Sequence, residues 1–489
     1  MTVGFLKIRP AEAFVETIYI RADGSIEPLT APIQRNGDIY TLAADIASSS
    51  DGMQVEKDNI VIDGNGYTLQ GIGNYFDGIK LIQDENVTVQ NMKIKLFSNG
   101  ILLDSSSNIT IRGNKIASNL DGVRLDYFSC YSTISGNNIT ANRDYGVVLY
   151  SHCNYNSFSG NDITDNMYGI TLSLYSSNNS FSGNNIRANS YEGIYLMSDC
   201  TFNSFRENRI TYSYEGIALE TSSNYNSFSG NDITDNMYGV RINCASQNSF
   251  YFNRFFDNSH QVIFDTPRYV NVWDNGYPAG GNYWSDYPGV DLYCGVFQNE
   301  TGGDGIDDAP YVIDGSNQDR YPFIVHNVAV TDVSASARLI YEGASLGIKV
   351  TAANLGDLTE TLRIAVYINE TEIETQEATL SSRHSTTVVF TWNTTGFAKG
   401  HYTIRAAIDA VPDEIFTVDN SLTGQTVPVA TIDLNADKVV NIIDVAIVAK
   451  QFGRPPPPIE DLRADVNMDG NVDILDLVIV AIHFGETIG

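Results

Sequence analysis

The feature that most constrains this chain is a repeat of about 23 residues. Two segments that start 70 residues apart, 154–170 and 224–240, both read NYNSFSGNDITDNMYG followed by Ile or Val. A Gly followed by an apolar–x–apolar triplet recurs at steps of 22, 22, 24, 23, 24, 23 and 23 residues. This row consists of Gly78, Gly100, Gly122, Gly146, Gly169, Gly193, Gly216 and Gly239. Self-similarity at a fixed period of roughly 20–50 residues indicates a solenoid, propeller or array.

The repeat has the periodicity of strands. Each copy contains three short runs in which alternate residues are apolar, and no run is long enough for a helix. Gly, Asn, Asp and Ser fill the corners, where turn or left-handed backbone geometry is needed. Leucine-rich repeats have a similar length, but they require a Leu/Asn spacing that is absent here. We therefore expect a parallel β-helix with three strands per coil and neighbouring coils about 4.8 Å apart.

Two apolar rows keep the same step and identify the interior. In a β-helix, equivalent residues of successive coils stack, so each inward row becomes a ladder of like side chains. The first row is Ile111, Ile134, Phe158, Phe181, Phe205, Phe228 and Phe250. The second, in an Asn–x–Ile pattern, is Ile116, Ile139, Ile163, Ile186, Ile210, Ile233 and Phe255. Residues 1 to about 58 precede the regular coils, and their runs Ile18–Ile20 and Ile39–Leu42 are expected to be strands that cap the solenoid.

The charge and the glycosylation sequons favour an extracellular, soluble setting. Lys and Arg total 29 against 59 Asp and Glu, a net charge of −30, which disfavours nucleic acid and anionic membranes. No run of eighteen apolar residues exists to span a membrane. The first residues lack the apolar core of a signal peptide. Either the protein is intracellular or its signal is not in this sequence. We favour the second alternative and expect a secreted or cell-surface protein, because the rest of the chain has extracellular features. Seven Asn-x-Ser/Thr sequons occur, at Asn86, Asn108, Asn138, Asn178, Asn299, Asn369 and Asn393.

Five cysteines pose the question of a disulfide. They are Cys130, Cys153, Cys200, Cys244 and Cys294, and the first three occupy similar places in their coils. Cys130 and Cys153 fall in adjacent coils, close enough for a disulfide. Stacked, buried thiols in a row with Ser177 and Ser223 are the favoured interpretation.

The solenoid resembles a known family. Val61–Gly71, the repeated Asn–x–Ile and Gly–Ile–x–Leu patterns and the segment GGNYWSDY at 280–287 look like NosD-type right-handed β-helix domains. The resemblance covers residues 18–325, within a domain expected over 1–325, and implies the fold more than the function. The family name belongs to a copper-related accessory protein. Copper sites require clusters of Cys, Met and His, and here only His152 beside Cys153 offers such ligands, so a copper-related role is the least favoured alternative.

The end of the solenoid is rich in Asp and Gly. Within residues 289–314, four carboxylates could surround a hard cation, with carbonyl oxygens completing its shell. These residues, a possible third calcium site, are Asp291, Asp304, Asp307 and Asp308. The alternative is a cluster of Asp/Gly turns that needs no metal.

From about residue 326 to 429 the period changes. Short alternating strands come every eight to twelve residues, which indicates an immunoglobulin-like β-sandwich of seven strands. Six of these strands are expected at Val328–Val333, Leu346–Ala352, Leu362–Ile368, Thr386–Trp392, Tyr402–Ile408 and Leu422–Val427. The segments 354–356, 391–396 and 419–420 make this region resemble a CARDB-type module, which implies a spacer or adhesion unit without a catalytic cluster.

Two matching acidic loops lie near the C-terminus, in a domain expected over 430–489. Each provides oxygen ligands at positions 1, 3, 5, 9 and 12 and a backbone carbonyl at position 7, the spacing of an EF-hand calcium loop. The first loop consists of Asp433, Asn435, Asp437, Val439, Asn441 and Asp444. The second consists of Asp465, Asn467, Asp469, Asn471, Asp473 and Asp476. An apolar helix follows each loop and ends at Phe-Gly, so we expect helices over Asp444–Phe452 and Asp476–Phe484.

Asp at position 12 and the tandem loop–helix unit resemble a type I dockerin over residues 431–487. This resemblance implies calcium as a cofactor and a cohesin protein as partner. Loop positions 10 and 11 of dockerins meet the cohesin, and here they are Ile442, Ile443, Ile474 and Leu475. Two departures stand out: Lys438 occupies position 6, where Gly eases the turn, and Pro455–Pro458 form a stiff spacer between the halves.

The β-helix also offers one acidic pair for chemistry. Glu192 and Glu215 precede Gly193 and Gly216, one coil apart, so their Cα atoms are expected about 4.8 Å apart. Two such carboxylates repel each other, and the pKa of one of them rises. They are the candidate catalytic residues if the solenoid is a polysaccharide lyase or glycoside hydrolase. The regularity of the repeats argues against a unique active site, so we favour a carbohydrate-binding or structural surface module that the dockerin tethers.

Overall fold

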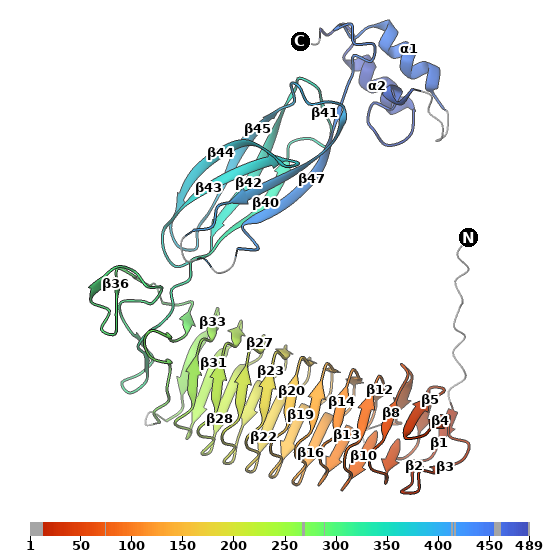
Figure 1. Ribbon diagram of the computed structural model, residues 1–489, viewed down its shortest axis with the longest axis vertical. Coiled ribbons are helices and arrows are strands. Elements are labelled where there is room, and N and C mark those ends of the chain that lie inside the picture. Colours follow the sequence, from red (N-terminus) through yellow and green to blue (C-terminus); the bar gives the residue numbers. More distant parts are fainter. Residues whose placement is uncertain are drawn as a thin grey trace. The chain divides into compact units, whose positions relative to one another are not determined.

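The computed structural model describes residues 13–73, 75–266, 269–287, 289–411, 414, 417–453 and 461–487. The chain divides into two compact units, Met1–Phe323 and Ile324–Gly489. The first unit is a right-handed parallel β-helix, and the second combines a β-sandwich with two short helices (Figure 1). The spacer Pro455–Pro458 lies outside the described residues.

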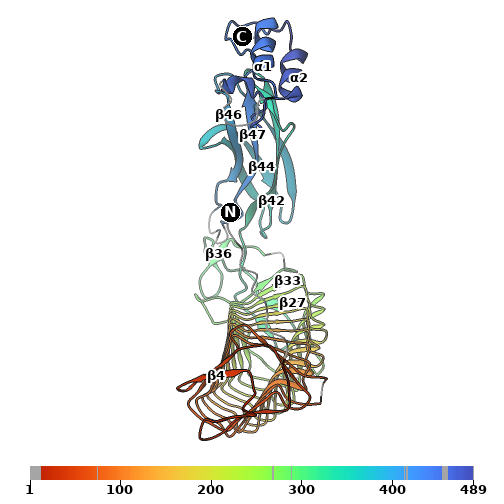
Figure 2. The same cartoon turned by 90° about the vertical axis from the view of Figure 1, so that its right-hand side faces the viewer.

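Three sheets form the β-helix, and successive coils lie over one another in Figure 2. Sheet A is β1 (Ala13–Val15), β6 (Ile46–Ser48), β9 (Thr68–Gln70), β12 (Lys93–Lys95), β15 (Lys115–Ala117), β18 (Asn138–Thr140), β21 (Asp162–Thr164), β24 (Asn185–Arg187), β27 (Arg209–Thr211), β30 (Asp232–Thr234), β33 (Arg254–Phe256) and β35 (Tyr283–Trp284). Sheet B is β3 (Ile26–Glu27), β2 (Ile18–Ile20), β7 (Met53–Val55), β10 (Ile79–Ile82), β13 (Asn99–Asp104), β16 (Asp121–Asp126), β19 (Tyr145–Tyr150), β22 (Tyr168–Ser173), β25 (Glu192–Leu196), β28 (Glu215–Glu220), β31 (Tyr238–Asn243) and β34 (His260–Phe264). Sheet C is β4 (Ile33–Asn36), β5 (Ile39–Leu42), β8 (Val61–Asp63), β11 (Thr88–Gln90), β14 (Thr110–Arg112), β17 (Thr133–Ser135), β20 (Ser157–Ser159), β23 (Ser180–Ser182), β26 (Ser204–Arg206), β29 (Ser227–Ser229) and β32 (Ser249–Tyr251).

The apolar rows stack inward as the sequence predicts. In sheet C, Phe181 pairs with Phe158 on one side and with Phe205 on the other. Their rings stack at 4.7 Å between centroids in both contacts. The Ile row stacks in the same way in sheet A, where Ile186 pairs with Ile163 and Ile210. Every residue of both rows is 0% exposed, so one apolar column runs the length of the coils.

The Gly row is required by the closeness of the coils. A Cβ atom added at Gly146 would lie 2.8 Å from the carbonyl oxygen of Gly169 in the next coil and 2.8 Å from Cγ2 of Ile163. Real Cβ contacts are not this short, so any other residue would push two coils apart.

Three Asn ladders hold the corners together. Within a ladder, each side-chain oxygen accepts bonds from the backbone and side-chain nitrogens of the Asn one coil earlier, as between Asn203 and Asn226 (2.9 and 3.0 Å). The longest ladder ends at Asn282, whose backbone N–H donates to Asp319 Oδ2 at 2.6 Å. A second ends at Asn271, whose N–H donates to Asn317. The Asp/Gly-rich closing segment therefore continues the hydrogen bonding of the last coil. Its short strands are β36 (Tyr293–Cys294), β37 (Glu300–Thr301), β38 (Tyr311–Val312) and β39 (Gln318–Asp319).

All five cysteines are free thiols. The predicted row is correct only in part, because Cys130 lies one position away from the row that holds Cys153 and Cys200. The amide of Cys153 donates to Ser176 Oγ rather than to Ser177, so the row alternates with Ser176 and Ser223. The pattern of apolar and polar residues did not distinguish two adjacent corner positions.

The second unit opens with the sandwich. One sheet is β40 (Val328–Ala335), β42 (Ser345–Asn354) and β45 (Ser385–Asn393). The other is β41 (Ile340–Tyr341), β47 (Ser421–Ala430), β46 (Gly400–Ile408), β43 (Glu360–Ile368) and β44 (Thr371–Leu380). The sequence pattern missed the two-residue strand β41 and also β44, which is a polar edge strand (TEIETQEATL) in which only Leu380 is buried.

Two helices, α1 (Ile442–Gln451) and α2 (Ile474–Ile482), and a 3₁₀ turn, η1 (Leu462–Ala464), complete the unit. Both helices begin two residues earlier than predicted, since Asn441 and Asp473 act as N-caps. Their core contains nine buried residues and is joined by Leu339 and Tyr341 of the sandwich. Lys399, also from the sandwich, donates to the backbone oxygens of Arg463 and Asp465. The division of this unit into 326–429 and 430–489 stays a prediction.

Candidate functional site

The two acidic loops close in the same way. Asp444, at position 12 of the first loop, accepts the amides of Leu434 (2.7 Å) and Asn435 (3.1 Å) with Oδ1. Its Oδ2 accepts the amide of Asn441 at 2.8 Å. Both loop-closing aspartates, Asp444 and Asp476, are 0% exposed. Each loop is therefore folded back on its own position 12.

The second loop repeats these bonds. Asp476 accepts the amides of Val466 (2.7 Å) and Asn467 (3.1 Å) with Oδ1 and that of Asp473 (2.9 Å) with Oδ2. Several of the remaining predicted ligands bond one another within their loop, as Asn467 does with Asp469 Oδ2 in the second. In the first, Asp437 Oδ2 accepts the side-chain nitrogens of Asn435 and Asn441. The sequence duplication thus becomes a duplication of geometry.

One unsatisfied oxygen shows that the second loop fits a cation. Asp465 Oδ1 is buried and has no hydrogen-bond partner among the described residues. Burial raises the pKa of this carboxyl group above its ordinary value, and Asp476 and Asp469 raise it further. A buried, unpaired carboxylate oxygen is costly, and a bound cation removes that cost. In the part of the chain that the structure describes, no three His, Cys, Asp or Glu side chains are already gathered around one point, so the loop carboxylates are not yet arranged as a closed metal site.

The residues at position 6 of the two loops share a left-handed backbone conformation but differ in residue type. Lys438 has φ = +71°, and Gly470, its counterpart, has φ = +89°. Both lie in the left-handed region that favours glycine, so the first loop carries strain that the second lacks.

The four predicted partner-binding residues are exposed. Ile442 is 66%, Ile443 51%, Ile474 56% and Leu475 54% exposed. They occupy the first turns of α1 and α2, directly after the N-caps. None belongs to the core, so all four side chains are available to a partner.

The acidic pair lies on the outer face of sheet B. Glu192 and Glu215 are register partners in β25 and β28. Glu215 is 3% exposed, and its Oε1 accepts a 2.9 Å bond from Arg241 of β31. Tyr195 donates to Glu220 Oε2 at 2.9 Å beside them. The structure thus brings the predicted pair together and surrounds it with side chains from three coils.

The two carboxyl groups differ in their surroundings. Burial and the neighbouring Glu215 raise the pKa of Glu192 to about 7. Burial also raises the pKa of Glu215, but Arg241 opposes this rise. Glu192 is therefore the more readily protonated of the two near neutral pH. The second oxygens, Glu192 Oε2 and Glu215 Oε2, are buried and have no partner among the described residues.

Two features of this face were missed from the sequence. Arg241 stands two residues after Gly239, at an outward position, and its spacing from Glu215 in the sequence does not by itself show that the two side chains meet. Ser213 replaces Asn in the third corner ladder, between Asn189 and Asn236, and its hydroxyl has no partner within the described part of the chain. The strict repeat is therefore broken next to Glu215, which the regularity of the glycine row concealed.

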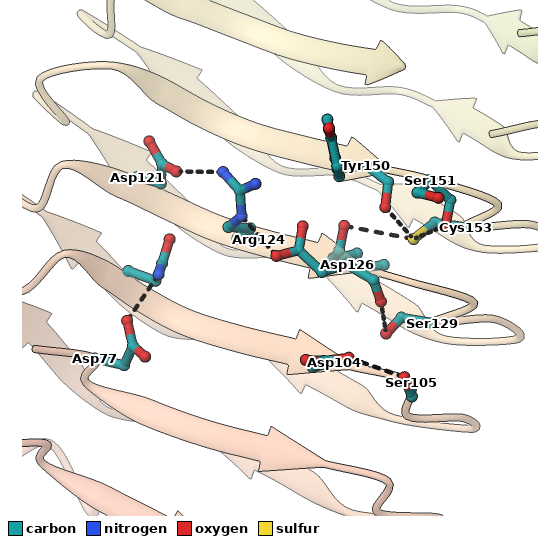
Figure 3. Close-up of polar contacts among 12 residues, drawn as sticks. Asp77, Asp104, Ser105, Asp121, Arg124, Asp126, Ser129, Tyr150, Ser151 and Cys153 are labelled. Carbon is teal, nitrogen blue, oxygen red and sulfur yellow. Dashed lines mark hydrogen bonds and ion pairs between the residues drawn. The ribbon is translucent and has the colours of Figure 1, made fainter. Parts of the chain in front are cut away.

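A second charged group lies three coils earlier on sheet B (Figure 3). Arg124 pairs with Asp121 at 3.1 Å and with Asp126 at 2.9 Å. Burial raises the pKa of Asp121 to about 6. Between this group and Glu192, the rings of Tyr145 and Tyr168 stack at 5.1 Å. The face thus alternates acids, arginines and tyrosines along the axis.

The carboxylates of the predicted third calcium site are used within their own loop. Asp291 accepts the amides of Asp304 and Gly305. Asp307 accepts those of Val290 and Ala309. Asp308 accepts those of Leu292 and Tyr293. These bonds give each of the three aspartates a structural role, and the third calcium site stays a prediction.

The pair proposed for copper does not face one point. Cys153 is 0% exposed and its thiol donates to the carbonyl of Leu125 in the interior. His152 stacks outside against Phe128 at 4.9 Å and lies 5.3 Å from Tyr175. The geometry offers copper no paired ligands here.

Comparison with known families assigns three regions. "Right handed beta helix region" matches residues 39–186, "Periplasmic copper-binding protein (NosD)" matches 171–289, and "Dockerin type I domain" matches 431–484. No curated protein sequence matches the chain. No helix in the described part of the chain is long and apolar enough to cross a membrane.

Solved structures resemble separate parts of the chain. A CARDB domain from Pyrococcus furiosus, in complex with di-metal ions, is 23% identical and covers 22% of this chain and 89% of its own, with a TM-score of 0.19. The periplasmic alginate epimerase AlgG is 12% identical over 54% of this chain and 84% of its own, with a TM-score of 0.40. A mutant of DFA-IIIase from Arthrobacter chlorophenolicus A6, in complex with DFA-III, is 14% identical over 49% of this chain and 68% of its own, with a TM-score of 0.32.

Proposed function

We propose that this is an extracellular or cell-surface protein that its dockerin attaches, with calcium, to a cohesin-type partner. The observation that carries this proposal is the pair of equivalent loops, each closed on a buried aspartate and each followed by two exposed apolar side chains. The match to a type I dockerin over residues 431–484 supports it. The acidic composition and the seven sequons agree with an extracellular location.

Calcium would be held by the oxygen ligands of the two loops. Asp433, Asp437 and Asp444 provide carboxylates in the first, and Asp465, Asp469 and Asp476 in the second. A hard divalent cation prefers such oxygens. The ion would compensate the charge that gathers within each loop and so fix the start of the helix that follows.

The β-helix is proposed to bind polysaccharide on the outer face of sheet B. Tyr145 and Tyr168 offer aromatic surface, and Glu192 offers a carboxyl group that is only half-buried. Hydroxyl groups of a sugar would bond this carboxyl group, while Glu215 is covered and would act only as its neighbour. The face extends over many coils, which suits a linear chain that runs along the axis.

The docking proposal is tested with the full chain and recombinant type I cohesins. We expect binding with calcium and none with EDTA. The double variant Ile442→Asp/Ile474→Asp should weaken binding at least 100-fold, because it places charges in both apolar contact surfaces. Val389→Asp is the matched control, since Val389 is 55% exposed on the sandwich. Equal binding by the double variant would refute the assigned surface.

The glycan proposal is tested by retention on immobilised acidic and neutral polysaccharides. Glu192→Gln keeps the shape of the side chain but removes the ionisable group. Retention of the wild type and weaker retention of this variant would support the face as the binding site. If no polysaccharide of the panel retains the chain, the proposal fails for sheet B and the docking proposal is unaffected.

A second candidate is a lyase or hydrolase, favoured by the different environments of Glu192 and Glu215. A protonated acid beside a carboxylate held by arginine is an acid–base arrangement. Register partners on adjacent strands lie at the short separation of a nucleophile pair rather than the wider one of an inverting pair. However, Glu215 is almost fully covered, so binding is the better-supported function. New reducing ends or unsaturated products from any polysaccharide, lost in Glu192→Gln, would reverse this order.

A further inference from the structure

One corner of the β-helix, between sheets B and C, carries an exposed aromatic ladder. Its members occupy equivalent places in successive coils and have φ between +56° and +59°. The row is Asn86, Asn108, Tyr131, Tyr155, Asn178, Phe202, Tyr225 and Gln247 (φ = +58° at Gln247). The backbones stack in register, because the amides of Tyr131, Tyr155 and Asn178 each donate to a carbonyl of the next coil.

The rings in this row form two separate stacks. Tyr131 and Tyr155 lie 5.2 Å apart with 3° between their planes. Phe202 and Tyr225 lie 5.2 Å apart with 9° between their planes. Asn178 stands between the stacks, one coil from each. It is exposed, and its side chain is much shorter than a ring.

The interruption leaves two aromatic faces opposite each other. Each stack covers one face of its inner ring and leaves the other turned toward the coil of Asn178. Tyr155 and Phe202 remain 53% and 59% exposed. Two coil steps separate them by about 10 Å. A ring inserted midway would lie about 5 Å from each, within the range of stacked ring contacts.

We propose that this interruption binds one pyranose ring of a polysaccharide between Tyr155 and Phe202, with the Asn178 amide bonding its hydroxyl groups. A saturated ring projects C–H groups from both faces, and these carry the partial positive charge that the negative faces of aromatic rings attract. The net charge of −30 disfavours a nucleobase as the ligand. Nucleobases occur in nucleotides and nucleic acids, whose negatively charged phosphates an acidic protein repels.

A pyranose ring could reach this site from two sources. Asn178-Asn179-Ser180 is a glycosylation sequon, so the pyranose could be the first sugar of a glycan attached to Asn178, or it could belong to a free polysaccharide. This site lies on a corner row rather than on the outer face of sheet B. It therefore does not depend on the function proposed for Glu192 and Glu215.

Two matched variants separate this site from the rest of the ladder. Asn178→Tyr places a ring in the interruption, and the backbone accepts it because Tyr155 and Tyr225 occupy equivalent positions with φ = +59°. Asn108→Tyr extends the ladder at its other end without filling the interruption. Phe202→Ala removes one of the two faces.

The experiment measures saturation-transfer NMR of cellohexaose and of hexagalacturonate with the full, unglycosylated chain. Transfer from the wild type and from Asn108→Tyr, reduced at least tenfold in Asn178→Tyr and Phe202→Ala, supports a free saccharide ligand. In parallel, mass spectrometry of the natively produced protein shows whether Asn178 carries a glycan. An attached glycan, lost from Asn178→Gln with increased solvent labelling of Tyr155, supports the covalent source.

Two outcomes overturn the proposal. One is that neither probe binds and Asn178 carries no sugar. The other is that binding is the same in Asn178→Tyr as in the wild type. Because Glu192→Gln leaves the corner row intact, a chain that loses sheet B binding but keeps binding at Asn178 separates the two sites.

Discussion

The β-helix and the dockerin region are both built from repeats, but they are stabilised in different ways. In the β-helix, each coil repeats the same apolar, Asn and Gly positions, so stacking alone buries the Phe and Ile rows and satisfies the corner amides. The dockerin has two copies and, among the residues that the structure describes, a core of only nine buried side chains, a small core for a domain that folds by itself. Its repeated residues are acidic and gather charge instead of burying surface. A repeat stabilises itself only when its like residues attract or bury one another.

The largest expected effect is the removal of calcium. Treating the full chain with EDTA should unfold α1 and α2, because the buried carboxylates of Asp444 and Asp476 then lack the proposed cation. Hydrogen exchange should increase across residues 431–487 and stay unchanged in the coils 60–264. Added magnesium serves as a control, since it binds such flexible oxygen sites less well. Unchanged exchange in α1 and α2 would contradict the calcium-dependent fold.

Breaking a corner ladder should have the next largest effect. Asn203→Ala removes a side chain that donates to Ser176 and Asn226 and accepts from Asn179. The buried groups left without partners should lower the free energy of unfolding by about 2–5 kcal/mol. Thermal unfolding of the β-helix measures this change.

The control for this ladder is Asn138→Ala, because the Asn138 side chain is exposed and makes a weak 3.5 Å bond to Asp162. It should change stability by less than about 0.5 kcal/mol. Equal losses in the two variants would show that the ladder contributes nothing specific.

A smaller effect should distinguish the two calcium loops. Lys438→Gly relieves a left-handed residue at φ = +71°, a relief of about 1 kcal/mol, or roughly fivefold tighter calcium binding in the first loop. Gly470→Lys is the reciprocal control and should weaken the second loop by a similar factor. Calorimetric titration with calcium measures both. Two loops of equal affinity in the wild type would argue that the strain is compensated.

The smallest effect concerns pH. The raised pKa of Glu192, about 7 against an ordinary 4.5, means that the folded chain keeps a proton that the unfolded chain releases. This contribution to stability is complete below about pH 4.5 and is lost as the pH rises toward 7. Glu192→Gln cannot ionise, so the fall in β-helix stability between pH 5 and 7.5 should become shallower. Solvent screening keeps the difference in stability small. Parallel curves of stability against pH for the wild type and the variant would show that a group other than Glu192 causes the pH dependence.

Much of the β-helix could be predicted because its residues repeat. Each residue of the Gly, Ile and Phe rows must occupy one fixed position in its coil. In a wrong register, Cβ atoms would lie against carbonyl groups of the next coil at positions such as Gly146. The two acidic loops were predictable for a similar reason, since their residues follow a spacing that is local in sequence. The edge strand β44 was not, because a polar strand carries no apolar alternation.

The sequence by itself therefore determined the coil, the two acidic loops and the pairing of Glu192 with Glu215, because each follows from residues at fixed spacing. Only the tertiary structure decided what surrounds them. It placed Arg241 on Glu215, the break at Ser213 beside that pair, and Asn178 between two aromatic faces. These are contacts between coils, and their effects depend on burial and ring orientation. The spacing of residues within one repeat does not carry that information.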